Sequence, residues 1–179
     1  MTPDIMTVPI RPATLADAAR LPDLERSAGQ AFLAIPDLAW IASDDVQSET
    51  RHRELIETGT AWVAVDADDE PVGFLNGEAV GANLHILEIA VRSDLQGRGL
   101  GRALIEAAAH WAKARNMSAL TLTTFRDVPW NEPFYQRLGF RTLGPGDLTQ
   151  ALLDILEDET RNGLPRRCAM SRRLGEGGE

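Results

Sequence analysis

The chain has 179 residues, of which 44% are hydrophobic, and its formal net charge is −9 with a pI near 4.8. This charge argues against nonspecific nucleic-acid binding, which relies on clustered Lys and Arg, and it mildly favours cationic acceptors such as amines. A single cysteine, Cys168, excludes an intrachain disulfide and a cysteine-based metal cluster, and the apolar runs are too short to span a membrane. The polar start does not resemble a signal peptide, so we expect one cytoplasmic domain over residues 1–174 and a disordered tail over 175–179.

The first half of the chain predicts one strand, two helices and then three further strands. The first strand ends near Pro12, and the pattern Thr14–Asp17 resembles a capping box that begins a helix reaching about Gln30. A second helix is expected over residues 44–58, with Gly59 as its C′ residue. Apolar β-forming residues then predict strands over 61–67, 72–80 and 84–91.

The second half continues with alternating helices and strands. A helix is expected over about 98–115 with Asn116 as its C-terminal cap, and Asn131 can N-cap a short helix that Gly139 ends. The remaining predictions are strands over 118–124, 140–143 and 167–174 and an acidic amphipathic helix over 147–161. This order predicts an α/β (α+β) fold, a mixed sheet of about seven strands with helices on both faces.

The most informative stretch is Gln96–Gly101, which lies between a buried strand and a long helix. Its three glycines let the backbone approach a ligand, and the first amides of the helix form an anion site. Arg98 and Arg102 stand where the helix macrodipole disfavours cations, which fits a phosphate-bearing ligand; the alternative is a glycine-rich turn with solvated arginines. A Walker loop needs Gly-Lys-Ser/Thr, and the third glycine of a dinucleotide fingerprint is replaced by Arg102 or Leu104, so both nucleotide motifs fail.

The remaining pattern, Gln-x-x-Gly-x-Gly after a buried strand, resembles the acyl-coenzyme-A loop of the GCN5-related N-acetyltransferase (GNAT) superfamily. A second stretch, Asn131–Phe140, contains Phe-Tyr-x-x-x-Gly-Phe and resembles the C-terminal helix-and-strand signature of that family. The resemblance spans roughly Ile10–Leu143. It implies a mostly antiparallel GNAT-type sheet, acetyl-CoA as co-substrate, no metal, and direct transfer of an acetyl group to a primary amine in a ternary complex.

The resemblance also implies which residues hold coenzyme A. Backbone groups of Ile89–Val91 would bind the pantetheine arm, and the glycine-rich loop would bind the pyrophosphate. The expected contacts are Ile89, Ala90, Val91, Gln96, Gly97, Arg98, Gly99, Leu100, Gly101, Arg102 and Asn131. Asn131 departs from the family pattern, because the usual asparagine stands seven residues before the family's tyrosine, where this chain has Val128. Asn131 is therefore either a helix cap or a cofactor contact.

Tyr135, the single tyrosine of the chain, matches the family residue that protonates the departing thiolate. A phenol with a pKa near 10 stays protonated at neutral pH and can donate to a thiolate; the alternative is a packed aromatic. The general base is Glu88, His85 or no dedicated residue, and on an ideal strand these two side chains point to opposite faces. Asp127 and Trp130 are expected to line the acceptor pocket.

The predicted function is acetyl transfer to a small-molecule amine. One alternative is a protein N-terminus or lysine as acceptor, and another is a non-catalytic acyl-CoA-binding module. The helix 147–161 is either a lid beside the acceptor or a solvated surface helix. Cys168 is expected in the core, His52 and His110 on exposed helix faces, and the histidine spacing does not suggest a metal. The sequence leaves the oligomeric state open, with a homodimer as one alternative.

Overall fold

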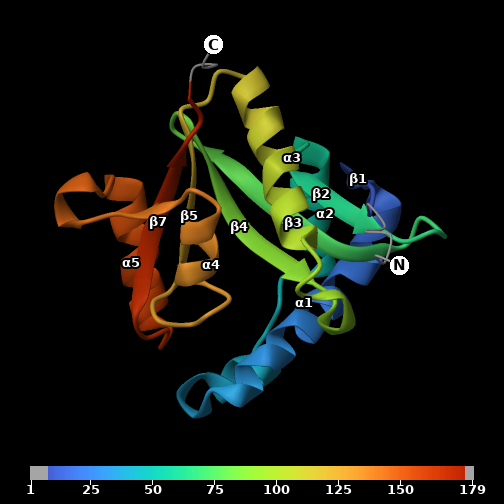
Figure 1. Cartoon of the computed structure of the whole chain (residues 1–179), viewed down its shortest axis with the longest axis horizontal. Coiled ribbons are helices and arrows are strands. Elements are labelled where there is room, and N and C mark those ends of the chain that lie inside the picture. Colours follow the sequence, from blue (N-terminus) through green and yellow to red (C-terminus); the bar gives the residue numbers. More distant parts are fainter. Residues whose placement is uncertain (1–7, 176–179) are drawn as a thin grey trace, which may run out of the picture. The chain divides into compact units, whose positions relative to one another are not determined.

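The computed structural model describes residues 8–175, which form a seven-stranded sheet (Figure 1). The strands are β1 (Ile10–Pro12), β2 (Ala61–Val65), β3 (Pro71–Val80), β4 (Asn83–Val91), β5 (Ala119–Phe125), β6 (Arg141–Thr142) and β7 (Arg167–Arg173). Their order in the sheet is β1-β2-β3-β4-β5-β7-β6. The β4–β5 pair is parallel, whereas β1–β2, β2–β3, β5–β7 and β6–β7 are antiparallel, so the predicted mixed, mostly antiparallel sheet is confirmed.

The helices and strands follow one another in the predicted order. The α-helices are α1 (Leu21–Gly29), α2 (Glu49–Thr58), α3 (Leu100–Ala114), α4 (Glu132–Arg137) and α5 (Gln150–Arg161). Short 3-10 helices are η1 (Leu15–Arg20), η2 (Gln30–Ala34), η3 (Pro36–Ser43), η4 (Ser93–Leu95) and η5 (Pro145–Asp147). Among the described residues, no helix combines the length and apolar character that a membrane span requires.

The chain divides into two compact units. The first consists of Met1–Gly77 and Leu87–Ala108, and the second of Glu78–Ile86 and Ala109–Glu179. The single domain expected over residues 1–174 stays a prediction, and the predicted tail lies outside the described residues except for Gly175.

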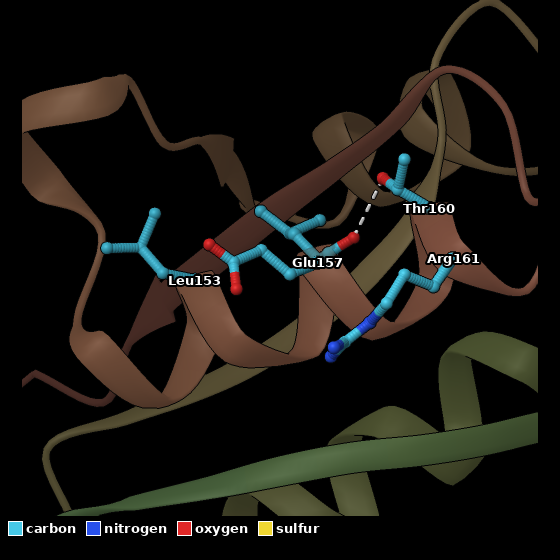
Figure 2. Close-up of a pocket in the computed structure, with 5 residues that line it drawn as sticks. Leu153, Glu157, Thr160 and Arg161 are labelled. Atoms are coloured by element: carbon cyan, nitrogen blue, oxygen red, sulfur yellow. Dashed lines mark hydrogen bonds between the residues drawn. The ribbon is translucent and has the colours of Figure 1, made fainter.

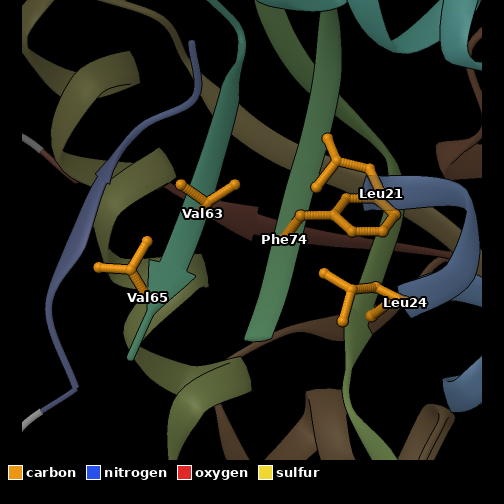
Figure 3. Close-up of a cluster of buried hydrophobic side chains, with 6 residues drawn as sticks. Leu21, Leu24, Val63, Val65 and Phe74 are labelled. Carbon is orange, nitrogen blue, oxygen red and sulfur yellow. The ribbon is translucent and has the colours of Figure 1, made fainter. Parts of the chain in front are cut away.

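In the first unit, α1 packs on one face of the sheet. Its core joins Leu21 and Leu24 of α1 to Val63, Val65, Phe74 and Ala90 of the strands. Figure 3 shows the Phe74 ring beside Leu21 and Leu24. Each fully buried Leu, Val or Phe side chain of this kind contributes about 1.5–3 kcal/mol to folding, so this face anchors α1 to the sheet.

The opposite face of the first unit is covered by α3. Gly73 precedes Phe74 and therefore points to the other side of β3. A Cβ at Gly73 would lie 3.1 Å from the carbonyl oxygen of Ala90 and 3.6 Å from Leu104 of α3. Glycine at this position thus allows β3, β4 and α3 to approach closely.

In the second unit, β5 pairs along its length with β7 and over three residues with β4. Leu152 of α5 packs against Leu143 and Ala169. The α5 helix begins at Gln150 rather than at the predicted residue 147, because η5 precedes it and Thr149 caps it by accepting a hydrogen bond from the Leu152 N–H at 3.2 Å. The face of α5 that carries Leu152 therefore packs in the core of this unit, and the choice between a lid and a surface helix stays a prediction.

The first two predicted helices differ most from expectation. The capping-box prediction is confirmed, since the Asp17 carboxylate accepts the Thr14 N–H at 2.7 Å, but the first turns are 3-10 and α1 starts only at Leu21. The second helix starts at Glu49 after the Ser48 cap, not at residue 44. Its end is confirmed, because Gly59 adopts a left-handed φ of 84°.

Candidate functional site

The glycine-rich loop joins the end of β4 to the start of α3 in the first unit. Gly97 and Gly99 have φ values of 77° and 84°, the left-handed region that favours glycine. The left-handed turn at Gly99 ends the loop, so α3 begins at Leu100 rather than at the predicted Arg98. In the described part of the chain, no atom beyond the adjoining residues lies within 4 Å of a Cβ built at either glycine, so the loop has room for a ligand.

The start of α3 offers donors and cations together. The carbonyl of Gly99 accepts the Ala103 N–H at 3.0 Å, so the amides of the intervening first turn have no intrahelical partners. Arg98 and Arg102 are exposed beside this turn. The Gln96 side chain donates to the Val91 carbonyl at 3.1 Å and ties the loop to the end of β4. Open backbone amides next to two solvated cations fit a polyphosphate group.

Glu88 is half-buried on β4, two residues before Ala90, and it lies on the α1 face of the sheet. A hydrogen-bonding influence of Glu88 is among the causes that act on the pKa of Glu25 of α1. Burial raises the pKa of Glu25, although hydrogen bonds from the Gln47 amide and Glu88 act in the opposite direction. The Gln47 N–H donates to Glu25 Oε2 at 2.8 Å. Glu88 therefore lies near a second carboxyl group.

A partly buried chain of hydrogen bonds continues from Gln47. The Gln47 and Asn76 side-chain amides are 2.9 and 3.5 Å apart in their two contacts, and Asn76 Nδ2 lies 3.3 Å from His52 Nδ1. His52 is 1% exposed and packs edge-on against Phe74, with ring centroids 5.0 Å apart. Burial lowers the pKa of His52 to about 4.

The expectation that His52 is exposed is therefore wrong. The helix α2 turns this imidazole toward the sheet, where Asn76 meets it, whereas His110 is exposed as expected. Sequence reasoning also missed Glu25 and Gln47. The one available signal was Asn76, an uncharged polar residue inside an apolar strand, because a buried amide needs partners.

Tyr135 lies on α4 in the second unit and is 8% exposed. Its ring packs edge-on against Phe134 at 5.1 Å and Phe140 at 5.7 Å between centroids. Gly139, with a φ of 91°, turns the chain so that the Phe140 N–H reaches the Tyr135 carbonyl at 3.1 Å. The Phe-Tyr-x-x-x-Gly-Phe motif therefore fixes the orientation of the phenol.

Asn131 stands at the N-cap position of α4, but its side chain forms hydrogen bonds with the end of β5 and none with the helix. Its Oδ1 accepts the Thr124 hydroxyl at 2.7 Å and the Phe125 N–H at 3.4 Å. The predicted capping role is corrected, because the side chain joins the end of β5 to the start of α4. In the intervening loop Asp127 has a φ of 63° and is exposed, and Trp130 is 37% exposed.

His85 lies in a buried polar cluster of the second unit. It is 3% exposed and its Nδ1 is 2.9 Å from the Thr121 hydroxyl. Burial lowers the pKa of His85, while the charges of Glu78 and Glu159 oppose this shift. His85 belongs to the second unit, whereas Glu88 belongs to the first.

Glu159 of α5 is held by two partners in the same unit. Its Oε2 accepts hydrogen bonds from Arg167 at 2.6 Å and from the Thr123 hydroxyl at 3.0 Å. Its Oε1 is buried without a hydrogen-bond partner among the described residues. This ion pair fastens α5 to β5 and β7 and contributes to the polar surroundings of His85.

The sequence also singled out Cys168 and the acidic helix that forms α5. Cys168 is 1% exposed, and burial together with Glu132 raises its pKa to about 12, so the thiol is an inert core group.

A surface depression of about 460 Å³ lies along α5 (Figure 2). Its lining residues are Leu153, Leu156, Glu157, Thr160 and Arg161. Within residues 8–175 no group of three His, Cys, Asp or Glu side chains gathers closely enough to hold a metal ion.

This chain is similar in sequence and in fold to known proteins. A family model described as "Acetyltransferase (GNAT) family" matches residues 29–140. The chain is 30% identical over 135 residues to the peptidyl-lysine N-acetyltransferase YjaB of Salmonella typhimurium, a match that covers 67% of this chain and 81% of that protein.

Two solved structures show the same fold. The N-acetylglutamate synthase of Neisseria gonorrhoeae, complexed with coenzyme A and N-acetyl-glutamate, has a TM-score of 0.72 at 18% identity and covers 96% of this chain and 36% of its own. Rv2747 of Mycobacterium tuberculosis, in complex with coenzyme A, has a TM-score of 0.70 at 16% identity and covers 93% and 99%. Since the family model spans more than half of the chain, the protein belongs to the GNAT family of acetyl-CoA-dependent N-acetyltransferases.

Proposed function

We propose that this enzyme transfers the acetyl group of acetyl-CoA to a primary amine of a small molecule, by direct attack in a ternary complex. The observation that carries this proposal is the half-buried Glu88 carboxyl on β4, which acts on the pKa of Glu25. A primary amine is a cation at neutral pH and must lose a proton before it can attack, so it needs an anionic group that accepts one. The net charge of −9 favours an acceptor of this sign.

The residues that would bind the acetyl donor, acetyl-CoA, and are named below lie in the first unit. The open amides at the start of α3, with Arg98 and Arg102 beside them, would hold the pyrophosphate of coenzyme A. Gln96 supports this loop through its bond to the end of β4, and Ile89–Val91 would hold the pantetheine arm through backbone groups. Acetyl-CoA supplies the activated acetyl thioester.

Two residues would move the protons. Glu88 would take one proton from the amine and pass it to solvent, and Tyr135 would give its hydroxyl proton to the departing thiolate. The packing of Tyr135 between Phe134 and Phe140 supports this role, because a fixed phenol loses little entropy when it donates. Asn131 would position the start of α4 rather than contact coenzyme A directly.

The acceptor has a second candidate. The Salmonella relative is named a peptidyl-lysine N-acetyltransferase, and at 30% identity this favours a lysine side chain as the alternative acceptor. A lysine side chain and a small amine present the same primary ammonium to Glu88. Asp127 and Trp130, both exposed in the loop before α4, would contact the rest of the acceptor in either case.

Steady-state release of free thiol from acetyl-CoA tests the proposal. The panel should contain small diamines, amino acids and lysine-containing peptides. We expect turnover with small amines, and both Glu88→Gln and Tyr135→Phe should lower kcat/KM by about 10²–10⁴. Glu57→Gln, an exposed change on α2, is the matched control.

Turnover only with peptides would select the lysine alternative. If no amine raises thiol release above hydrolysis, the proposed function is wrong. If Glu88→Gln keeps full activity, the assignment of the base is wrong.

A further inference from the structure

The helix α4, which carries Tyr135, has six residues and depends on its neighbours for its position. A helix of this length is not stable in isolation, and the Asn131 side chain at its N-cap binds the end of β5 instead of capping it. The Tyr135 N–H donates to the Asn131 carbonyl at 3.0 Å, so the first turn of α4 sets the place of the Tyr135 backbone. The contacts that hold this turn therefore also determine where the phenol side chain starts.

Glu132, the first residue of α4, holds this turn with a single carboxylate oxygen. Its Oε2 accepts the Thr142 hydroxyl of β6 at 2.6 Å and the Cys168 thiol of β7 at 3.5 Å. Arg126, in the loop after β5, lies 3.9 Å from the same oxygen. The Glu132 side chain is 14% exposed, so water competes little for these contacts. One side chain thus joins α4 to three other segments of the second unit.

The chemistry of these groups agrees with an anchor. Burial, with the charge of Glu132, raises the pKa of Cys168 to about 12, so the thiol keeps its proton at neutral pH and remains a donor. A hydroxyl that donates to a carboxylate forms short hydrogen bonds, as the Thr142 contact does. Residues at positions i and i+3 of a helix lie on the same side, which places the Glu132 anchor beside Tyr135.

We propose that Glu132 is a positioning residue for Tyr135: by binding Thr142 and Cys168 it holds the first turn of α4 where the phenol can give its proton to the departing thiolate. This inference rests on the proposed function of Tyr135. As the C–S bond breaks, its electron pair stays on sulfur, which takes up the phenol proton, and the tyrosinate regains a proton from solvent. A displacement of the phenol by about 1 Å is enough to slow such a step by about 10²-fold.

The first test observes the phenol itself and does not depend on turnover. Tyr135 is the single tyrosine of the chain, so protein made with ring-labelled tyrosine gives the NMR signals of this residue alone. Glu132→Ala and Thr142→Val should both shift these ring signals, because each removes the shortest contact of the anchor. Glu132→Gln keeps an acceptor oxygen for Thr142 and should resemble the wild type. Gln136→Ala, an exposed change on the same helix, is the matched control.

The second test asks whether Glu132 acts through Tyr135. Glu132→Ala should lower kcat by about 10–100-fold with little change in the KM for acetyl-CoA, and Glu132→Gln should keep most of the activity. In the Tyr135→Phe background the same change to alanine should lower kcat by less than about twofold, because the proton donor is already absent. A merely structural role would lower kcat by the same factor in both backgrounds. If Glu132→Ala does not fold, Thr142→Val takes its place in the cycle.

Two results would overturn the inference: unchanged tyrosine signals in both Glu132→Ala and Thr142→Val, or equal losses of kcat with and without the Tyr135 hydroxyl. Equal losses in an enzyme that Tyr135→Phe impairs would leave the proposed function standing. Shifted tyrosine signals in a protein that acetylates no amine would support the anchor and refute the proposed function. The two failures are therefore distinguishable.

Discussion

His52 should make the protein lose stability as the pH falls from about 7.5 to about 5. The imidazole is 1% exposed, its Nδ1 faces the Asn76 amide at 3.3 Å, and its Nε2 has no hydrogen-bond partner among the described residues. An amide nitrogen only donates, so Nδ1 accepts and the neutral ring carries its proton on Nε2. A second ring proton would have to displace the Asn76 contact, which adds to the cost of burying the charge.

The size of the effect follows from the two pKa values. Burial lowers the pKa of His52 from 6.5 to about 4 in the folded protein, so the unfolded chain binds the proton first as the pH falls. The stabilisation is therefore fully present above pH 6.5 and is lost as the pH falls through about 4. At about 1.4 kcal/mol per pKa unit the full loss is roughly 3 kcal/mol, and about 2 kcal/mol of it occurs by pH 5.

Other groups titrate in the same range, so a variant has to isolate His52. The lowered pKa of His85 adds to the loss, and the raised pKa of Glu25 opposes it. His52→Leu removes the titration while Asn76 keeps its contact with Gln47. Urea unfolding at a series of pH values should show that this variant loses about 2 kcal/mol less than the wild type between pH 7.5 and 5.

The exposed His110 of α3 provides the control, since His110→Gln should leave the pH dependence of the wild type unchanged. If His52→Leu does not fold, His52→Gln serves the same comparison. The reasoning is refuted if the wild type and the His52 variant lose the same free energy of unfolding to within about 0.5 kcal/mol.

Three further substitutions test other parts of the structure. Gly99→Ala forces an L-residue to a φ of 84° at a cost of about 1–2 kcal/mol, so calorimetry should show coenzyme A binding roughly tenfold weaker. The control is Gly163→Ala, which has a φ of 82° after α5 and should lower stability but not the affinity for coenzyme A. Arg167→Met removes the cation paired with the half-buried Glu159 carboxylate, which keeps its hydrogen bond from the Thr123 hydroxyl, and should lower the free energy of unfolding by about 3 kcal/mol at most in urea; adding Glu159→Leu should restore part of the loss. Ser48→Ala removes the cap of α2 and should cost about 1 kcal/mol by thermal unfolding.

The sheet was predictable because its strands carry the period and composition of half-buried and buried β-structure. The predicted strand over 84–91 differs from β4 by one residue at its start, and Gly59 and Asn116 mark helix ends by their positive φ, as expected. The segment between α1 and α2 was not predictable in the same way. Its apolar residues support 3-10 turns as well as an α-helix, and the choice depends on packing that local sequence does not encode.

In the candidate site, too, the features set by local sequence were predictable and those set by long-range contacts were not. The glycine-rich loop and the Tyr135 motif depend on local backbone geometry, so their sequence patterns are strong. Glu25, by contrast, is influenced by Glu88 across more than sixty positions of the chain, and neither residue stands in a motif with the other. His52 was misplaced for a related reason: a histidine on a polar helix gives no sign of which side faces the sheet until the partner strand, with Asn76, is known.

The choice between Glu88 and His85 as general base can be made from pH profiles, because each has its own partners. If His85 is the base, its contact with Thr121 matters, and His85→Gln should abolish the acidic limb of kcat/KM while Glu25→Gln leaves that limb in place. If Glu88 is the base, Glu25→Gln should move the limb to lower pH and His85→Gln should leave its position unchanged. Since burial lowers the pKa of His85, an acidic limb set by this residue moves toward the pH range in which a glutamate titrates, and the two limbs can lie close together in the wild type. The profile of the wild type alone therefore cannot separate them, and it is the response to the Glu25 substitution that identifies the base.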